Sequence, residues 1–152
     1  MINKILFVCT GNTCRSPMAE ALMKDMIARD NKLRAKGIEV DSAGFYPAGL
    51  PATREAIDIM KEYGLDLKGH RSQLLDQNLL NWADLVLVME REHENDIYEQ
   101  YQNVDGKIYL LSEYVGDRGD IPDPWQRGLE RFRECAVTLE HNINNLVKKL
   151  KT

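Results

Sequence analysis

The sequence Val8-Cys9-Thr10-Gly11-Asn12-Thr13-Cys14-Arg15-Ser16-Pro17 joins two segments of different character near the N-terminus. Residues 4–8, which lead into it, form a short β-branched and aromatic run that is typical of a buried strand. Gly11-Asn12 then interrupts the pattern, and Ser16-Pro17 suits the start of a helix, with Ser as the N-cap and Pro in the first position. Apolar residues follow at helical spacing to about residue 29. The stretch therefore predicts a strand, a tight loop and a helix in succession.

The same alternation of strand and helix continues along the chain. We expect further strands at residues 38–42, 85–89 and 107–111, and further helices at residues 53–63, 91–98 and 129–150. Four strands alternating with helices predict an α/β fold, a three-layer sandwich in which helices cover both faces of a four-stranded parallel sheet. The length of 152 residues suits a single domain spanning residues 1–152. In such sheets the functional cleft lies beyond the carboxyl ends of the strands.

Composition and charge exclude several classes of partner. The chain carries 20 Lys and Arg against 24 Asp and Glu, a net charge of −4, and it has no dense basic run. We therefore expect no binding to nucleic acid or to an anionic membrane. The longest apolar runs, residues 5–9 and 85–89, are too short for a membrane span or a signal-peptide core. The default location is the cytosol.

The cysteines and histidines predict neither a disulfide framework nor a metal site. There are three of each: Cys9, Cys14, Cys135, His70, His93 and His141. The C-x4-C spacing of Cys9 and Cys14 differs from that of a zinc knuckle, and the histidines are scattered singly. We expect Cys135 to be inert, and His93 and His141 to lie on polar helix faces outside the site. No metal and no cofactor is expected, so the chemistry must come from side chains and backbone.

The loop after the first strand has the features of an anion-binding site. A loop that bends around a helix N-terminus turns its N–H groups inward, and the helix dipole strengthens their hold on an anion. We expect Gly11 to allow close approach of the backbone and Asn12 to accept a left-handed conformation. Arg15 can grip two phosphate oxygens with its planar guanidinium. The same positive field favours the thiolate of Cys9, so the stretch predicts a nucleophilic phosphatase site.

The motif Cys-x5-Arg-Ser near the N-terminus, together with Asp123-Pro124 far downstream, resembles the low-molecular-weight protein tyrosine phosphatase family over essentially the whole chain. The resemblance implies that Cys9 is the nucleophile and forms a phosphocysteine intermediate. Asp123 would be the general acid and then the general base, and Ser16 would donate its hydroxyl to the Cys9 sulfur. The phosphoryl oxygens would be bound by Arg15 and by the loop residues Thr10, Gly11, Asn12, Thr13 and Cys14.

The resemblance also implies supporting residues and pocket walls. Ser42 and His70 would hold the loop through hydrogen bonds to Asn12. Trp125 would form one wall of the substrate slot. Residues 45–46, Phe-Tyr, are candidates for the other wall, where the family often has a Trp further along the loop and this chain has Ala-Gly at residues 48–49.

Three other functions share parts of this pattern. A thioredoxin-coupled arsenate reductase has the same fold and loop, but needs further redox cysteines in mid-chain, and none lies between Cys14 and Cys135. A phosphocysteine carrier of a sugar transport system has a related loop and needs neither Arg15 nor Asp123. A non-enzymatic phosphopeptide-binding module would keep its binding when Cys9 is removed, whereas a phosphatase would lose all turnover.

The substrate would be a phosphorylated protein, and a cognate kinase is a possible partner. Phosphotyrosine is the family default, while some bacterial members resembling this chain hydrolyse phosphoarginine instead. Many tyrosine-specific members have Ile at the position of Thr13, and the phosphoarginine-specific ones resemble this chain in having Thr. From the family default we expect hydrolysis of phosphotyrosine, and Thr13 makes phosphoarginine the alternative.

Overall fold

The computed structural model describes residues 1–152 and contains one parallel sheet with the strand order β2-β1-β3-β4. Its strands are β1 (Lys4–Cys9), β2 (Glu39–Gly44), β3 (Leu85–Val88) and β4 (Ile108–Leu110). The four-stranded parallel α/β sheet is thus confirmed, and the ends of every predicted strand agree with the structure to within two residues. One shift matters for the chemistry, because β1 extends to Cys9 and the sulfur therefore stands at the carboxyl edge of the sheet.

The helices are α1 (Arg15–Ala28), α2 (Asn31–Ala35), α3 (Arg54–Glu62), α4 (Gln77–Trp82), α5 (Arg91–Gln100), α6 (Leu111–Tyr114) and α7 (Leu129–Leu150). The four predicted helices are present. Three short helices, α2, α4 and α6, were missed because four to six residues are too few for a helical period to show. Their only strong signal is the Asp N-cap of two of them, Asp30 and Asp76, whose side chains accept from Leu33 N and Leu79 N. None of the helices combines the length and the apolar character that crossing a bilayer requires.

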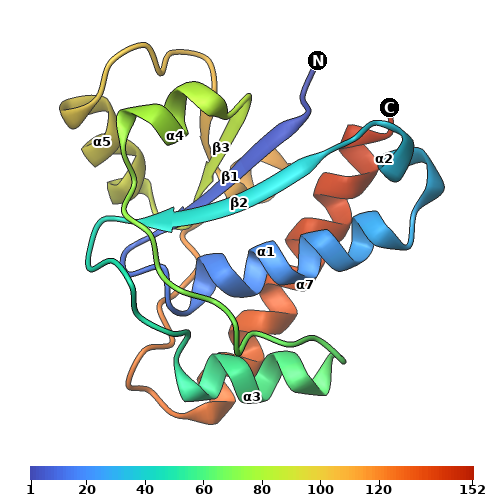
Figure 1. Cartoon of the computed structure of the whole chain (residues 1–152), viewed down its shortest axis with the longest axis vertical. Coiled ribbons are helices and arrows are strands. Elements are labelled where there is room, and N and C mark those ends of the chain that lie inside the picture. Colours follow the sequence, from blue (N-terminus) through green and yellow to red (C-terminus); the bar gives the residue numbers. More distant parts are fainter.

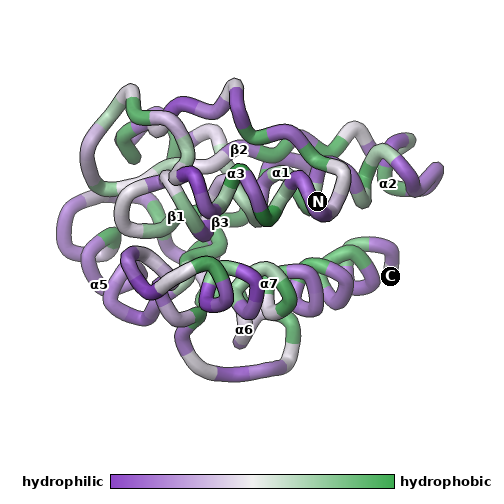
Figure 2. The backbone as a smooth tube through the Cα atoms, turned by 90° about the horizontal axis from the view of Figure 1, so that it is seen from below, coloured by the Kyte–Doolittle hydropathy of each residue, from purple (hydrophilic) through white to green (hydrophobic).

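Helices cover both faces of the sheet (Figure 1). On one face, alternate residues of β1 and β3 such as Phe7 and Leu87 pack against α1, α3 and α7 in the larger core cluster. On the other face, Val8 and Val88 pack with residues of α4 and α5 in the smaller one. Figure 2 shows hydrophobic and hydrophilic residues alternating along α7, as expected of a helix with one buried face. The two cores fix the sheet from both sides.

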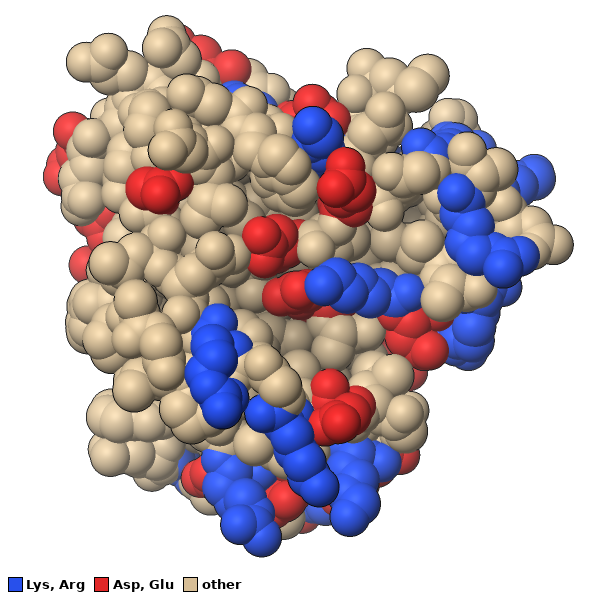
Figure 3. Space-filling view, in the orientation of Figure 1, with Lys and Arg blue, Asp and Glu red and all other residues tan.

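The outer surface carries charges of both signs. On the face seen in Figure 3, basic side chains gather over α2 and α3, while acidic side chains lie among them and across the middle of the view. Most ion pairs are local contacts along a helix, such as Arg29 with Asp25 and Arg131 with Glu134. Exposed pairs of this kind stabilise a fold only weakly.

The register of β1 and β2 brings Gly44 against the loop that follows Cys9. A Cβ at Gly44 would lie 2.8 Å from Asn12 N and 2.9 Å from both Gly11 C and Thr10 O, which are backbone atoms that cannot move aside cheaply. A Cβ at Gly11 would meet only ordinary contacts at 3.6 Å. Within the protein, the close backbone approach therefore depends on Gly44. Gly11 lines the cavity instead, and the close approach of its backbone to a bound anion stays a prediction. Asn12 has a φ of 54°, which confirms its left-handed conformation.

We predict that Gly44→Ala destabilises the protein by roughly 1–3 kcal/mol, since the new methyl group must displace the loop backbone. The change in the free energy of unfolding is measured by urea titration. Gly69→Ala is the matched control, because a Cβ there meets nothing within 4 Å. Equal stability of the two variants would show that the loop does not depend on the space at Gly44.

Candidate functional site

The loop of residues 10–14 runs from the end of β1 directly into the first turn of α1. The helix begins at Arg15, with Cys14 at the N-cap position and no side-chain hydrogen bond capping it. Ser16 was expected to be the N-cap, and the structure corrects this, because Ser16 lies inside the first turn and its hydroxyl points to Cys9. The first N–H groups of α1 are thus left without a side-chain acceptor, which is the arrangement that binds an anion.

A cavity of about 230 Å³ opens above Cys9. Eight residues expected at the site line it: Cys9, Thr10, Gly11, Thr13, Cys14, Arg15, Asp123 and Trp125. The other four, Asn12, Ser16, Ser42 and His70, do not line it and are bonded to one another or to the loop beneath it. Tyr46, Pro47 and Leu50 also line the cavity. Of the two aromatic residues proposed for the second wall, Tyr46 is in the lining, whereas the ring of Phe45 packs beside His93.

The hydrogen bonds around Ser16 aim its proton at the Cys9 sulfur. Asn12 Oδ1 accepts from the backbone N–H of Gln73 at 2.9 Å, which orients Nδ2 toward Ser16. Asn12 Nδ2 donates to Ser16 Oγ at 2.8 Å, so the hydroxyl keeps its own proton for another acceptor. Cys9 Sγ lies 2.9 Å from that oxygen. Ser16 can therefore stabilise negative charge on the sulfur.

Asn12 is the centre of the bonds that hold the loop. Its Nδ2 also donates to Ser42 Oγ at 2.9 Å, and Ser42 in turn donates to Glu20 Oε1 at 2.6 Å. His70 Nε2 lies 2.7 Å from the carbonyl oxygen of Asn12, which can only accept, so this nitrogen carries a proton. The contacts expected of Ser42 and His70 are thus present. Glu20 and Gln73 were missed, since nothing in their local sequence marks them.

The guanidinium of Arg15 is almost completely buried beside the sulfur. Its Nη1 donates to the carbonyl oxygen of Ile121 and pairs with Glu90 Oε2, both at 2.7 Å. Burial alone would lower the pKa of Arg15, but the charges of Cys9, Asp123 and Glu90 raise it above its ordinary value. Arg15 is therefore a fixed cation, and its buried Nε has no hydrogen-bond partner within the protein.

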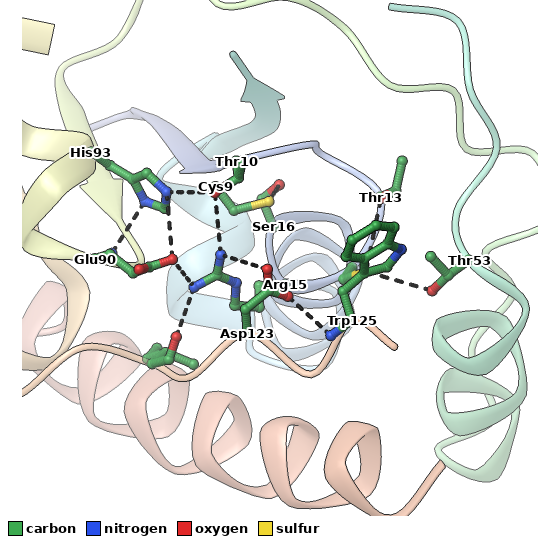
Figure 4. A network of polar contacts seen from close by, with 12 residues as sticks. Cys9, Thr10, Thr13, Arg15, Ser16, Thr53, Glu90, His93, Asp123 and Trp125 are labelled. Atoms are coloured by element: carbon green, nitrogen blue, oxygen red, sulfur yellow. Dashed lines mark hydrogen bonds and ion pairs between the residues drawn. The ribbon is translucent and has the colours of Figure 1, made fainter. Parts of the chain in front are cut away.

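Asp123 stands at the mouth of the cavity, within reach of solvent. Its side chain is 43% exposed, with Oδ2 3.7 Å from Arg15 Nη2 (Figure 4). Asp123 Oδ1 accepts from the backbone N–H of Trp125 at 3.1 Å, and this bond turns the carboxylate into a fixed orientation. The ring of Trp125, itself exposed, stands over the opening. This placement suits a group that exchanges protons with a molecule in the cavity.

His93 does not lie on an exposed face as expected. It is 4% exposed, and its Nε2 lies 2.9 Å from Thr10 Oγ1. The expectation failed because the residues around it, Glu-Arg-Glu-His-Glu, resemble a solvated helix surface, whereas the N-terminal turn of α5 faces the loop. Glu90, the N-cap of that helix, was missed for the same reason. His141 does lie on an exposed face of α7.

The other two cysteines are held in their neutral form. Burial raises the pKa of Cys14 to about 11, against the opposing effect of hydrogen bonds from Thr53 and Thr13. Burial also raises the pKa of Cys135 to about 12. Of the three thiols, only Cys9 combines a place on the floor of the cavity with a hydroxyl donor and an adjacent cation.

Comparison with known proteins gives a consistent result. The family model described as "Low molecular weight phosphotyrosine protein phosphatase" matches residues 4–152. A protein-arginine-phosphatase of Geobacillus stearothermophilus is 41% identical, over 98% of this chain and 97% of that protein. A probable low-molecular-weight protein-tyrosine-phosphatase, EpsP of Ralstonia solanacearum, is 33% identical, over 99% and 98%. Among solved structures, a mutant of the YwlE arginine phosphatase with a phosphorylated active-site serine superimposes with a TM-score of 0.91 at 37% identity, over 98% and 96% of the two chains.

We predict that iodoacetamide at neutral pH alkylates Cys9 and leaves Cys14 and Cys135 free. The reason is that the thiolate is the reactive form, and the two other thiols are protonated at pH 7. Peptide mass spectrometry identifies the labelled site, and urea-unfolded protein, in which all three react, is the control. Labelling of Cys14 at the rate of Cys9 would contradict this assignment.

Proposed function

Because the chain belongs to the low-molecular-weight protein tyrosine phosphatase family, we propose that it hydrolyses phosphorylated proteins through a phosphocysteine intermediate on Cys9. The observation that carries this mechanism is the position of the Cys9 sulfur. It lies on the cavity floor between the uncapped start of α1 and the buried guanidinium of Arg15. A phosphoryl group seated there meets a nucleophile from below and positive charge from the sides.

In the first step, the Cys9 thiolate attacks phosphorus, forming the S–P bond as the bond to the leaving group breaks. The N–H groups of the loop, with Arg15 Nε and Nη2, bind the three remaining oxygens. Asp123 in its acid form gives the leaving group its proton. The unpartnered Nε of Arg15 supports this arrangement, since a buried donor without an acceptor costs free energy that a bound phosphate recovers.

In the second step, water attacks the phosphocysteine and the S–P bond breaks. Asp123, now a carboxylate, takes a proton from that water, and inorganic phosphate leaves. Ser16 donates to the departing sulfur and so lowers the energy of the thiolate. The same pocket, aspartate and thiolate thus serve both halves of the reaction.

Phosphoarginine is the substrate that we propose first, with phosphotyrosine as the second candidate. Identity to relatives does not separate the two, because the protein-arginine-phosphatase relative and a solved low-molecular-weight protein tyrosine phosphatase of T. tengcongensis are both 41% identical to this chain. Thr13, with its polar hydroxyl, lines the cavity, and the partly exposed carboxylate of Asp123 offers a partner for a guanidinium. Phosphotyrosine is favoured by the apolar surface that Tyr46, Leu50 and Trp125 offer to a phenyl ring.

We also propose that residues 1–152 form a single domain that acts on its substrates in the cytosol, where a cognate kinase would supply them. The family match over residues 4–152 supports the single domain. The proposed chemistry requires only side chains and backbone of this chain.

We predict that Cys9→Ser abolishes hydrolysis of aryl phosphates, because a serine hydroxyl is not ionised at neutral pH. Asp123→Ala should lower kcat about 10²- to 10⁴-fold on phenyl phosphate, whose leaving group needs a proton. The loss should be much smaller on a nitrated aryl phosphate, whose leaving group departs as an anion. Steady-state kinetics on both substrates measure the difference.

Each outcome separates the proposed enzyme from its alternatives. An equal loss on both substrates would argue against general-acid catalysis by Asp123. Substantial turnover by Cys9→Ser would contradict the covalent mechanism. A wild-type protein that binds phosphopeptide without turning it over would be a binding module.

We predict that Thr13→Ile shifts the ratio of kcat/KM toward phosphotyrosine by at least tenfold, about 1.4 kcal/mol, on one peptide carrying either phosphoryl group. An isoleucine wall suits a phenyl ring but leaves guanidinium donors unpaired. Thr13→Val keeps the shape without the hydroxyl, and Thr13→Ser keeps the hydroxyl without the methyl. If the ratio stays constant in all three variants, Thr13 does not select the substrate, and phosphotyrosine becomes the first candidate.

A further inference from the structure

We propose that His93 is a positioning residue of this site, whose neutral ring holds Thr10 and Glu90 against Arg15, and whose protonation loosens that hold. The effect of His93 on catalysis rests on the proposed function, whereas its effect on phosphate binding can be tested without it. It starts from a histidine that is buried next to the phosphate-binding loop and that the proposed reaction does not use.

The hydrogen bonds of the ring define its tautomer. His93 Nδ1 lies 3.2 Å from the backbone nitrogen of Glu90, which can only donate, so Nδ1 is the acceptor. The ring proton is then on Nε2, which donates to Thr10 Oγ1 at 2.9 Å. Only the neutral ring makes both bonds. A second proton on Nδ1 would face the N–H of Glu90 and break one of them.

Both partners of the ring contact the same guanidinium (Figure 4). Glu90 Oε2 is 2.7 Å from Arg15 Nη1, and Thr10 Oγ1 is 3.5 Å from Arg15 Nη2. One histidine therefore restrains a group at each terminal nitrogen of Arg15. The remaining acceptor of Nη1, the carbonyl of Ile121, comes from a different loop.

Packing leaves the ring little freedom to adopt another position. The ring of Phe45 lies beside it, with centroids 5.6 Å apart. Phe45 is itself fixed to the loop, because its backbone N–H donates to the carbonyl of Thr10 at 2.8 Å. His93 and Phe45 thus hold Thr10 through its side chain and its backbone respectively.

Burial and the charge of Arg15 together oppose the protonation of His93. Burial, followed by the positive charge of Arg15 on α1, lowers the pKa of His93 below its ordinary value of 6.5. Glu90 at the start of α5, Asp96 on α5 and Asp120 on the loop before Asp123 act in the opposite direction without reversing the shift. The ring is therefore neutral at pH 7. As the pH falls below 6.5, the histidine of an unfolded chain gains a proton first, and protonation of the folded ring follows at lower pH.

Two amide substitutions each remove one of the two hydrogen bonds of the His93 ring and keep the other. His93→Asn places an oxygen near the position of Nδ1 and keeps an acceptor for Glu90 N, whereas His93→Gln places an amide nitrogen near Nε2 and keeps a donor for Thr10. Neither amide can gain a proton. His141→Gln, at an exposed histidine of α7, is the matched control.

The binding test uses inorganic phosphate. The rise in Tm on adding phosphate is recorded between pH 5 and pH 8 for each protein, and kcat/KM on an aryl phosphate is measured in parallel. Ratios of variant to wild type at each pH cancel the titration of phosphate itself. The Tm of each protein without phosphate shows separately whether a variant is merely less stable than the wild type.

We expect each amide to weaken phosphate binding about five- to tenfold at pH 7. The deficit should shrink as the wild-type ring gains its proton at the acid end of this range, because the ring then loses its bond to Glu90 N, a loss that neither amide undergoes. The deficit of His93→Asn should also disappear in a Thr10→Val background, where the bond it removes is already absent. The His141→Gln control should match the wild type throughout.

Two results would overturn the proposal. The first is phosphate binding by both amide variants equal to the wild type at every pH. The second is a deficit that is constant with pH and additive with Thr10→Val, as a purely structural role would give. Failure of the proposed function is a separate result, since the wild type would then bind phosphate without hydrolysing the aryl ester.

Discussion

The burial of the Arg15 guanidinium is the constraint on which the site depends. A cation that is 1% exposed must be paired, and its partners come from two other parts of the chain: Glu90 after β3, and the loop that carries both the carbonyl of Ile121 and Asp123. Removing one partner would leave charge buried without compensation. The ion pair therefore aligns the loop of β1, the start of α5 and the loop of residues 121–125 around one cavity, and the sheet behind them keeps the three in register.

A second network, centred on Asn12, fixes the opposite side of the loop. Its side-chain bonds reach Ser16, Ser42 and the backbone of Gln73, so every polar atom of the buried amide is satisfied. The left-handed conformation of Asn12 stores strain that these bonds compensate. The loop is thus rigid before any ligand arrives, which is what electrostatic stabilisation of a transition state requires.

Sequence reasoning predicted the sheet, its four main helices and the grouping of Cys9, Arg15 and Asp123, since short motifs and strong periodicity carry those features. It could not find contacts that depend on how separate elements meet. The turn containing Glu90 and His93 has the composition of an exposed surface, and only its packing against the loop buries it. Gly44 lies in a strand without any turn signal, and its role follows from the register with β1. The start of α1 was misplaced by two residues, because Ser16, a good N-cap residue, lies in the first turn and contacts the Cys9 sulfur, whereas Cys14 is the N-cap.

The sequence separation of these contacts has a consequence for how the protein comes to be active. Arg15 and Ile121 are 106 residues apart, and Thr10 and His93 are 83 apart. Closing loops of this length costs chain entropy, and the packing of the sheet and α7 offsets this cost. The cavity can therefore be complete only when the sheet and α7 have packed, whereas the contacts within the helix that carries Arg15 are local. A growing or partly folded chain holds Cys9 without its pocket, so the catalytic competence proposed for this site depends on the complete fold.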